Sequence, residues 1–238
     1  MSDAEVSIEH HHRDLRGGGA RAAVFGVSDG LVTNVSLILG IAGAHPAGGI
    51  VRLAGIAGLV AGAFSMAAGE YVSMQAQREL FQRELDIERR ALKDSPAAEG
   101  AELVEIYKQR GIDPTVARDL VDEVMQDPEL ALETHAREEL GIDPSALGLP
   151  LQAAGSSFAT FAAGAFVPLL PWLITSGTAA IVASIAAAAV AALATGALLG
   201  ALSGRSKWRS ALRQLAIGTV AAAVTYGIGR LVGVGTGH

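Results

Sequence analysis

Residues 144–204 read "PSALGLPLQAAGSSFATFAAGAFVPLLPWLITSGTAAIVASIAAAAVAALATGALLGALSG", sixty-one positions without one Asp, Glu, Lys or Arg. A helix that crosses a bilayer needs roughly 20 apolar residues, so this stretch is long enough for two membrane spans and a turn. Residues 24–44, 51–74 and 211–234 each predict one further span. We therefore expect an all-α polytopic membrane protein with five transmembrane helices.

An acidic segment separates the second predicted span from the third. Residues 75–150 contain nine Lys and Arg against eighteen Asp and Glu, a net charge of −9, whereas the rest of the chain has nine against six, a net charge of +3. The predicted organisation is a polar N-terminal tail (1–20), transmembrane helices one and two (21–75), a cytosolic helical insert (76–150) and transmembrane helices three to five (151–238).

The insert contains clear helix signals. The segment "SMQAQRELFQRELDIERRALKD" continues the second span without a helix breaker, which predicts one long stalk helix that ends near Lys93. Three short helices follow, because a capping side chain precedes a proline at Ser95-Pro96, Asp113-Pro114 and Asp127-Pro128. The glycines of "RGID" and "LGID" are typical helix ends.

Basic residues predict the orientation. Cytosolic loops are enriched in Lys and Arg, and basic residues precede the first span and lie between the fourth and fifth: Arg13, Arg16 and Arg21, then Arg205, Lys207, Arg209 and Arg213. We expect a cytosolic N-terminus and a cytosolic insert. Three lysines against fifteen arginines, with abundant alanine and glycine, favour a GC-rich prokaryote, so the expected location is the bacterial plasma membrane.

Several kinds of chemistry are excluded or disfavoured. The chain has no cysteine, which excludes disulfides, thiolate metal sites and cysteine nucleophiles. No phosphate-binding loop of the nucleotide type occurs, which argues against ATP as an energy source. We expect no enzymatic activity, no tightly bound cofactor and no nucleic-acid partner.

The first two spans contain candidate ion ligands. Asp29 lies in the apolar stretch "GVSDGLVTNVSLILG", residues 26–40, where a charged side chain costs about 3 kcal/mol. On the second span one helical face contains Gly58, Gly62, Met66, Glu70 and Met74. That face could be a packing seam, which leaves Asp29 unexplained. Alternatively, Asp29, Met66 and Glu70 line a cation path whose mixed oxygen and sulfur ligands favour Fe²⁺, with Mn²⁺, Co²⁺ and Zn²⁺ as competitors.

The insert contains three pairs of possible ligands at helical spacing: Glu84 and Glu88, Glu99 and Glu102, and His135 and Glu139. Residues three or four apart share one helical face. A solvated acidic surface would explain any single pair. Three pairs in a segment with a net charge of −9 indicate bound cations.

The motifs "FGVSDGLVTN", "AGAFSMAAGEYVSMQAQRE" and "ELVEIYKQRGI…HAREELGI" resemble the vacuolar iron transporter family over about residues 20–235. The resemblance implies five transmembrane helices, a homodimer and a cytosolic metal-binding domain. It also implies export of Fe²⁺, and often Mn²⁺, from the cytosol in exchange for protons.

The same resemblance implies ligands residue by residue. The family's transmembrane ligands fall on Asp29, Met66 and Glu70, and its insert glutamates fall on Glu88, Glu99, Glu102 and Glu139. Two positions depart from the family pattern. Ala91 stands where members with a full site have a glutamate, although Glu84 lies nearby, and His135 stands where they have a methionine. Imidazole can replace a thioether as a ligand, so we expect an altered metal preference.

We therefore expect a proton-coupled antiporter for Fe²⁺ and Mn²⁺ that works as a homodimer in membrane lipid. A spacing of four between Gly196, Gly200 and Gly204 fits close helix packing, either between two copies or within one chain. A membrane ferroxidase is one alternative, but a di-iron bundle needs a Glu-x-x-His motif from each of two helices, and His135 is the insert's single histidine. A membrane scaffold whose acidic insert binds a protein is another.

Overall fold

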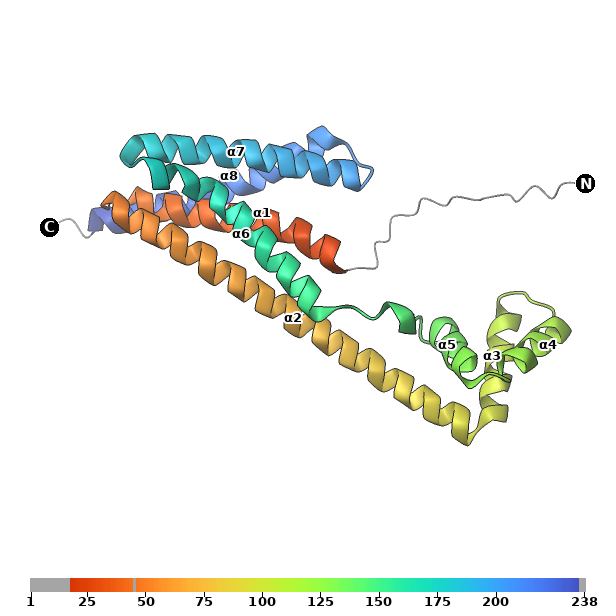
Figure 1. Cartoon of the computed structure of the whole chain (residues 1–238). Helices are drawn as coiled ribbons and strands as arrows, with labels where there is room; N and C mark the ends of the chain where they lie inside the picture. The colour runs from red at the N-terminus through yellow and green to blue at the C-terminus, as the bar shows by residue number, and fades with distance from the viewer. Residues whose placement is uncertain (1–17, 45, 236–238) are drawn as a thin grey trace, which may run out of the picture. The chain divides into compact units, whose positions relative to one another are not determined.

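The computed structural model describes residues 18–44 and 46–235, which form helices and no strand (Figure 1). Most of the predicted N-terminal tail, including Arg13 and Arg16, lies outside the described residues. The elements in chain order are α1 (Gly18–Gly43), α2 (Gly48–Asp94), α3 (Pro96–Gln109), α4 (Pro114–Val124), α5 (Pro128–Glu138), the 3₁₀ turn η1 (Pro144–Ala146), α6 (Pro150–Ile174), α7 (Gly177–Leu202) and α8 (Lys207–Gly235).

Five described helices, α1, α2, α6, α7 and α8, are long and apolar enough to cross a membrane. The predicted all-α fold with five transmembrane helices is therefore confirmed. Helix α8 begins at Lys207, four residues before the span predicted at 211–234. Lys207 and Arg209 are consequently on a helix and not in a loop.

Helix α2 is one uninterrupted helix of 47 residues, as the sequence predicts for the stalk. Its first half is apolar, and its second half contains most of its charged side chains. After Gly69 neither glycine nor proline occurs before its end at Asp94, so nothing in the sequence breaks the backbone hydrogen bonding.

The chain divides into two compact units. One, called here the membrane unit, consists of the chain up to Glu70 together with residues from Leu151 onward. The other, called the insert unit, is Tyr71–Pro150. Each has its own hydrophobic core. In the insert unit, Leu103, Val121, Val124 and Ala131 join α3, α4 and α5.

The helix ends of the insert unit follow the predicted signals with one exception. The carboxylate of Asp113 accepts a hydrogen bond from the amide of Thr115 (2.8 Å), and that of Asp127 accepts from the amide of Glu129 (3.0 Å). Ser95 precedes Pro96 as predicted, but its side chain makes no capping hydrogen bond. Gly111 and Gly141 have φ angles of 88° and 65°, the left-handed conformation that ends a helix at low cost with glycine.

In the membrane unit, small residues allow close helix packing. Gly196 and Gly200 of α7 face the backbone of α8 near Ala211 and Lys207, so this glycine spacing packs two helices of the same chain. Gly204 lies beyond α7 with a φ of 65° and has no neighbour within 4 Å of a Cβ placed there. Of the two interpretations of this spacing, the structure supports intramolecular packing.

The approach of α8 to α1 gives a prediction about stability. A Cβ at Gly229 would collide with the carbonyl oxygen of Gly40, whereas one at Gly227 would meet nothing within 4 Å. Gly229→Ala should therefore lower the thermal unfolding temperature, since overpacking costs about 1–3 kcal/mol. Gly227→Ala is the matched control and should leave stability unchanged or raise it slightly, because alanine is the better helix former. Circular dichroism in detergent measures both, and equal melting temperatures would contradict this packing.

Candidate metal centre

Three of the predicted ligands meet in the insert unit. Glu88 lies on α2, His135 on α5 and Glu139 at the C-terminal cap of α5. Nδ1 of His135 lies 3.2 Å from Oε1 of Glu88 and 3.8 Å from Oε2 of Glu139. Among the residues that the structure describes, this is the one group of three or more His, Asp or Glu whose ligand atoms all lie within 4.8 Å of one another. Such a spacing allows one cation to contact all three.

Apolar packing brings the two helices of this site together. Leu85 of α2 packs against Leu132 and Ala136 of α5. Glu88 lies one helical turn after Leu85, and His135 lies one helical turn after Leu132. The apolar contact therefore fixes the position of the polar one.

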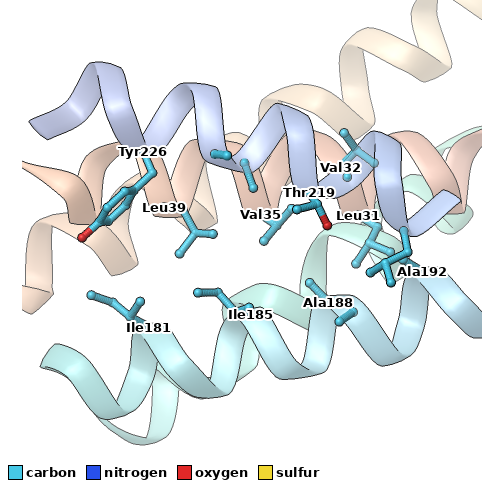
Figure 2. A pocket seen from close by; sticks show the side chains of 15 residues that line it. Leu31, Val32, Val35, Leu39, Ile181, Ile185, Ala188, Ala192, Thr219 and Tyr226 are labelled. Atoms are coloured by element: carbon cyan, nitrogen blue, oxygen red, sulfur yellow. The ribbon is translucent and has the colours of Figure 1, made fainter. Parts of the chain in front are cut away.

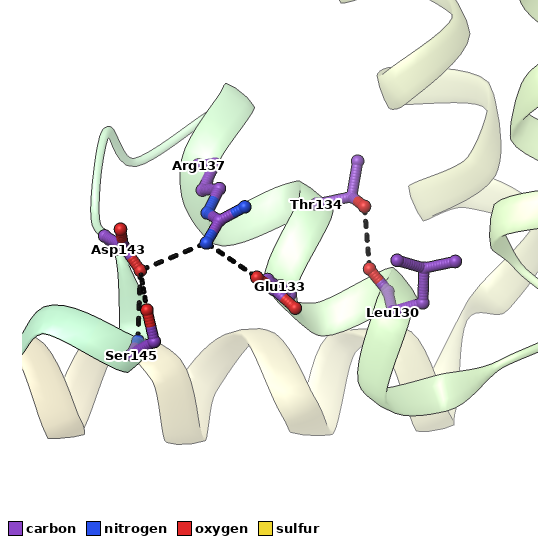
Figure 3. Close-up of polar contacts among 6 residues, drawn as sticks. All are labelled: Leu130, Glu133, Thr134, Arg137, Asp143 and Ser145. Carbon is purple, nitrogen blue, oxygen red and sulfur yellow. Dashed lines mark hydrogen bonds and ion pairs between the residues drawn. The ribbon is translucent and has the colours of Figure 1, made fainter. Parts of the chain in front are cut away.

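A polar network holds the end of α5 (Figure 3). The guanidinium of Arg137 contacts Oε1 of Glu133 (2.7 Å) and Oδ1 of Asp143 (3.2 Å). That same Asp143 oxygen accepts hydrogen bonds from the amide (3.1 Å) and the hydroxyl (2.7 Å) of Ser145. These contacts tie α5 to the turn that follows it, and Glu139 lies between the two.

Burial of these polar side chains costs free energy when no ion is bound to them. The side chain of His135 is 0% exposed, that of Glu88 is 8% exposed and that of Glu139 is 31% exposed. Within the described residues, Oε1 of Glu88 and both ring nitrogens of His135 are buried and make no hydrogen bond, because the close approach of Nδ1 to Oε1 lacks hydrogen-bond geometry. Buried polar atoms of this kind cost free energy unless a ligand satisfies them. A cation would satisfy the carboxylate and the neutral imidazole together.

Burial and neighbouring carboxylates, including Glu99 and Glu102, raise the pKa values of the two glutamates in this group. Burial, followed by the charges of Glu139, Glu99 and Glu102, raises the pKa of Glu88 from 4.5 to about 7. Burial also raises the pKa of Glu139, where the charges of Glu102 and Glu99 act in the same direction and His135 opposes them. Four glutamates and one histidine from α2, α3 and α5 thus interact electrostatically.

Other predicted insert residues lie outside the close group. Glu84 lies one turn before Glu88 on α2 and is half-buried, but it is not among the three residues that meet. Ala91, also half-buried, supplies no ligand atom. Beside the centre, Glu102 and Glu139 line a depression that also contains Arg110, which pairs with Glu138. Arg110 was not among the predicted site residues, because helical spacing gives no signal for a pair 28 residues apart.

The predicted ligands of the membrane unit lie on two helices. Asp29 is exposed on α1 and accepts a hydrogen bond from the hydroxyl of Thr33 (3.2 Å). On α2, Met66 packs partly buried beside Ala63 and Phe161, and Glu70 is half-buried. Asp29 and Glu70 belong to no group of three potential ligands in the described part of the chain.

The structure adds one polar residue that the sequence analysis did not single out. Asn34 is fully buried on α1, and its Nδ2 donates a hydrogen bond to the carbonyl of Ala165 on α6 (2.6 Å). Its presence inside an apolar stretch was a usable signal, since buried polar side chains in membrane helices need partners. This contact joins α1 to α6 near the middle of the apolar region.

Comparison with known proteins identifies the family. The family model described as the VIT family matches residues 20–230. The chain belongs to the VIT family. Vacuolar iron transporter 1 of Oryza sativa subsp. japonica is 32% identical over 237 residues, which cover 98% of this chain and 94% of the relative.

Two further members of the VIT family give the same result. Vacuolar iron transporter 1 of Arabidopsis thaliana is 32% identical, with 97% of this chain and 93% of the relative covered. The vacuolar iron transporter of Acanthamoeba castellanii is 35% identical, with 95% and 84% covered. The family resemblance drawn from the motifs is confirmed. Membership together with five apolar helices makes the chain an integral membrane protein of a transporter family and not an enzyme, which argues against the ferroxidase.

The pKa of Glu88 predicts how the metal-free insert responds to pH. A carboxyl group whose pKa is raised from 4.5 to about 7 stabilises the fold below about 4.5, and this contribution is lost as pH rises through about 7. Amide hydrogen exchange in α5, corrected for intrinsic rates, should therefore show weaker protection at pH 8 than at pH 5.5 in chelated full-length protein.

Two variants test the origin of that pH response. Glu88→Gln should reduce the pH dependence of protection in α5, because the amide does not ionise. Asp122→Asn changes an exposed carboxylate on α4 and should behave as the parent chain. Identical pH profiles for Glu88→Gln and the parent chain would show that another group controls the insert.

Proposed function

We propose that the chain exports Fe²⁺ from the cytosol in exchange for protons and also accepts Mn²⁺. The observation that supports this function most strongly is the similarity to vacuolar iron transporters over 94% and 93% of two relatives' lengths. The matched residues 20–230 include every predicted ligand in both units. Transport of a metal ion is the coarse function of this family, and the direction, the coupling ion and Mn²⁺ are parts of the proposal.

The insert unit serves as a metal-binding domain on the cytosolic side. Glu88, His135 and Glu139 supply one imidazole nitrogen and carboxylate oxygens, a set that suits Fe²⁺, Mn²⁺ and Zn²⁺. Glu99 and Glu102 add negative charge around this group. Together they raise the local concentration of cations before an ion enters the membrane unit.

The exposed position of Asp29 supports a homodimer. A carboxylate on the surface of a membrane-spanning helix costs about 3 kcal/mol if it faces lipid. Asp29 is exposed within the apolar segment Phe25–Gly43 of α1. A second copy of the chain that covers this surface would remove the penalty. Asp29 would then border an ion path that includes Met66 and Glu70.

Competition between protons and metal at the same carboxylates supports proton coupling. Metal ligands must lose their protons to bind. With a pKa of about 7, Glu88 is partly protonated near neutral pH, so a bound ion displaces a proton from it. The same competition at the carboxylates of the membrane unit would link the two fluxes. As part of the same proposal, the distribution of basic residues supports a cytosolic N-terminus and a cytosolic insert, and the composition supports a bacterial plasma membrane.

Transport by proteoliposomes tests the function directly. Purified chain should move Fe²⁺ across the bilayer when a pH gradient is imposed, and collapse of the gradient should stop net accumulation. Asp29→Asn keeps the size of the side chain but removes its charge, so it should reduce the rate at least tenfold. A metal-sensitive dye inside the vesicles measures uptake, and light scattering in mild detergent reports the mass of the dimer.

The control for this experiment is Glu129→Gln, which makes the same charge change at an exposed position of α5. It should transport at the parent rate. A wild-type rate in Asp29→Asn would place the ion path elsewhere. A monomeric mass for the unaltered chain would exclude the dimer while leaving the metal flux to be judged by the dye.

Metal binding by the full-length chain tests the insert site. His135→Ala removes the nitrogen ligand and should weaken Zn²⁺ more than Mn²⁺, because imidazole suits the softer ion. Affinity should also fall as pH drops from about 7.5 to 5.5, since protons compete for Glu88. Isothermal titration calorimetry measures both effects, with Glu129→Ala on the same helix as control. Equal losses for the two metals would remove His135 from the site, and no saturable binding would favour an acidic scaffold.

A further inference from the structure

An apolar cavity of about 430 Å³ lies among α1, α7 and α8 in the membrane unit (Figure 2). Leu31 and Leu39 line it from α1, Ile181 and Ile185 from α7, and Ala222 from α8. Among its lining residues, Thr219 and Tyr226 are the two whose side chains have polar atoms. None of the predicted metal ligands lines it, so the ion path does not explain it.

The dimensions of the cavity fit a hydrocarbon chain. Its volume is about three times the roughly 150 Å³ of a cavity that holds benzene, and it lies within the range of about 300–1,000 Å³ for ligand sites. The lining extends from Ile181 to Ala192 along α7, a rise of about 16 Å. It extends equally far from Leu215 to Tyr226 along α8. A long, apolar space of this kind suits an acyl chain better than a compact polar molecule.

The cavity is accessible from the surface of helices that lie in lipid. Ile185, one of its lining residues, is 49% exposed, and Thr219 and Ala223 are exposed as well. The helices around it are three of the five apolar enough to cross a membrane. Lipid is therefore the molecule most abundant at its opening.

A cluster of cations lies at one end of the same helices. The connection between α7 and α8 and the first turn of α8 expose Arg205, Lys207 and Arg209 together with Trp208, and we call these four residues the basic turn. Within the described residues, none of its cations pairs with a carboxylate. Trp208 is 67% exposed. Exposed tryptophan beside Lys and Arg is typical of a membrane helix at the level of the lipid headgroups.

Helix geometry aligns the basic turn with the cavity. Trp208 precedes Leu215 by seven residues, two turns of α8, so both lie on the same side of the helix. The rise from Lys207 to Leu215 is about 12 Å. One leaflet with its headgroups is about 20 Å thick. A lipid whose phosphate lies at the basic turn would therefore extend into the part of the cavity near Leu215 and Ala192.

We propose that this part of the membrane unit binds one anionic phospholipid, with an acyl chain in the cavity and the phosphate at the basic turn. The apolar lining encloses the acyl chain on three helices and so separates it from bulk lipid. The unpaired cations provide the preference for a negative headgroup. Bound in this way, the lipid fills the space between α1, α7 and α8 and stabilises their packing.

Native mass spectrometry of the full-length chain tests the site with two named lipids. Delipidated protein is mixed with phosphatidylglycerol or phosphatidylcholine, and the number of lipids retained per protomer is measured. We expect one phosphatidylglycerol to be retained more strongly than phosphatidylcholine. Substitution of all three cations by Gln should weaken phosphatidylglycerol about tenfold or more and leave phosphatidylcholine unchanged, and added salt should act in the same way.

A matched pair of variants tests the cavity. Gly218 lines it, and a Cβ there meets nothing closer than the 3.8 Å to Val32, so the ring of Gly218→Phe should enter the cavity from this position. Gly227 lies on the same helix outside the lining, with no neighbour within 4 Å, so Gly227→Phe is the control. The first should lose at least nine-tenths of the retained lipid, and the second should retain as much as the parent chain.

Three results would overturn the proposal. One is equal retention of phosphatidylglycerol by the two Phe variants, and another is equal affinity of the parent chain for both lipids. The third is a change of oligomeric mass in Gly218→Phe without loss of lipid, which would assign the cavity to a second copy of the chain. Ala189→Phe fills the cavity from α7 and repeats the test if Gly218→Phe does not fold.

Discussion

The uninterrupted backbone of α2 is the constraint on which the rest of the structure depends. Inside a membrane every backbone polar group must be paired within its own segment, which requires helix. The absence of glycine and proline after Gly69 lets this helix continue to Asp94. One element therefore supplies Met66 and Glu70 to the membrane unit and Glu88 to the insert unit. Within the insert unit, the last turns of α2 also supply Leu85, which packs against α5 beside Glu88.

The candidate metal centre combines two opposing requirements. Packing of Leu85 against Leu132 and Ala136 brings α2 and α5 together, and that packing buries Glu88 and His135. The same burial concentrates negative charge, which raises the pKa of two glutamates. The buried ligand atoms make no hydrogen bonds to the protein's own side chains. The packing of α2 on α5 thus both stabilises this region and creates the unsatisfied atoms that a cation could bind.

Much of this fold could be predicted from local sequence, whereas the centre could be predicted only as a set of candidates. Charge-free stretches located the spans, and the Asp-Pro steps located α4 and α5, because these signals act over a few residues. Helix α8 starts before the predicted span, at Lys207, because charged residues such as Lys207 and Arg209 can continue a helix beyond its apolar part. Spacing placed Glu84 and Glu88 equally well on one face. The family resemblance implied Glu88, and the packing of α2 on α5, between residues far apart in sequence, is what brings it to His135.

The raised pKa of Glu88 has a consequence for regulation under the proposed exchange. Each ion exported would bring protons into the cytosol. Because the pKa of this carboxyl group is about 7, small local acidification would protonate it and reduce the loading of the next ion. The exporter would then slow itself in proportion to its own output. Such negative feedback requires no separate regulatory domain, and the cell's capacity to buffer protons would set the ceiling on metal flux.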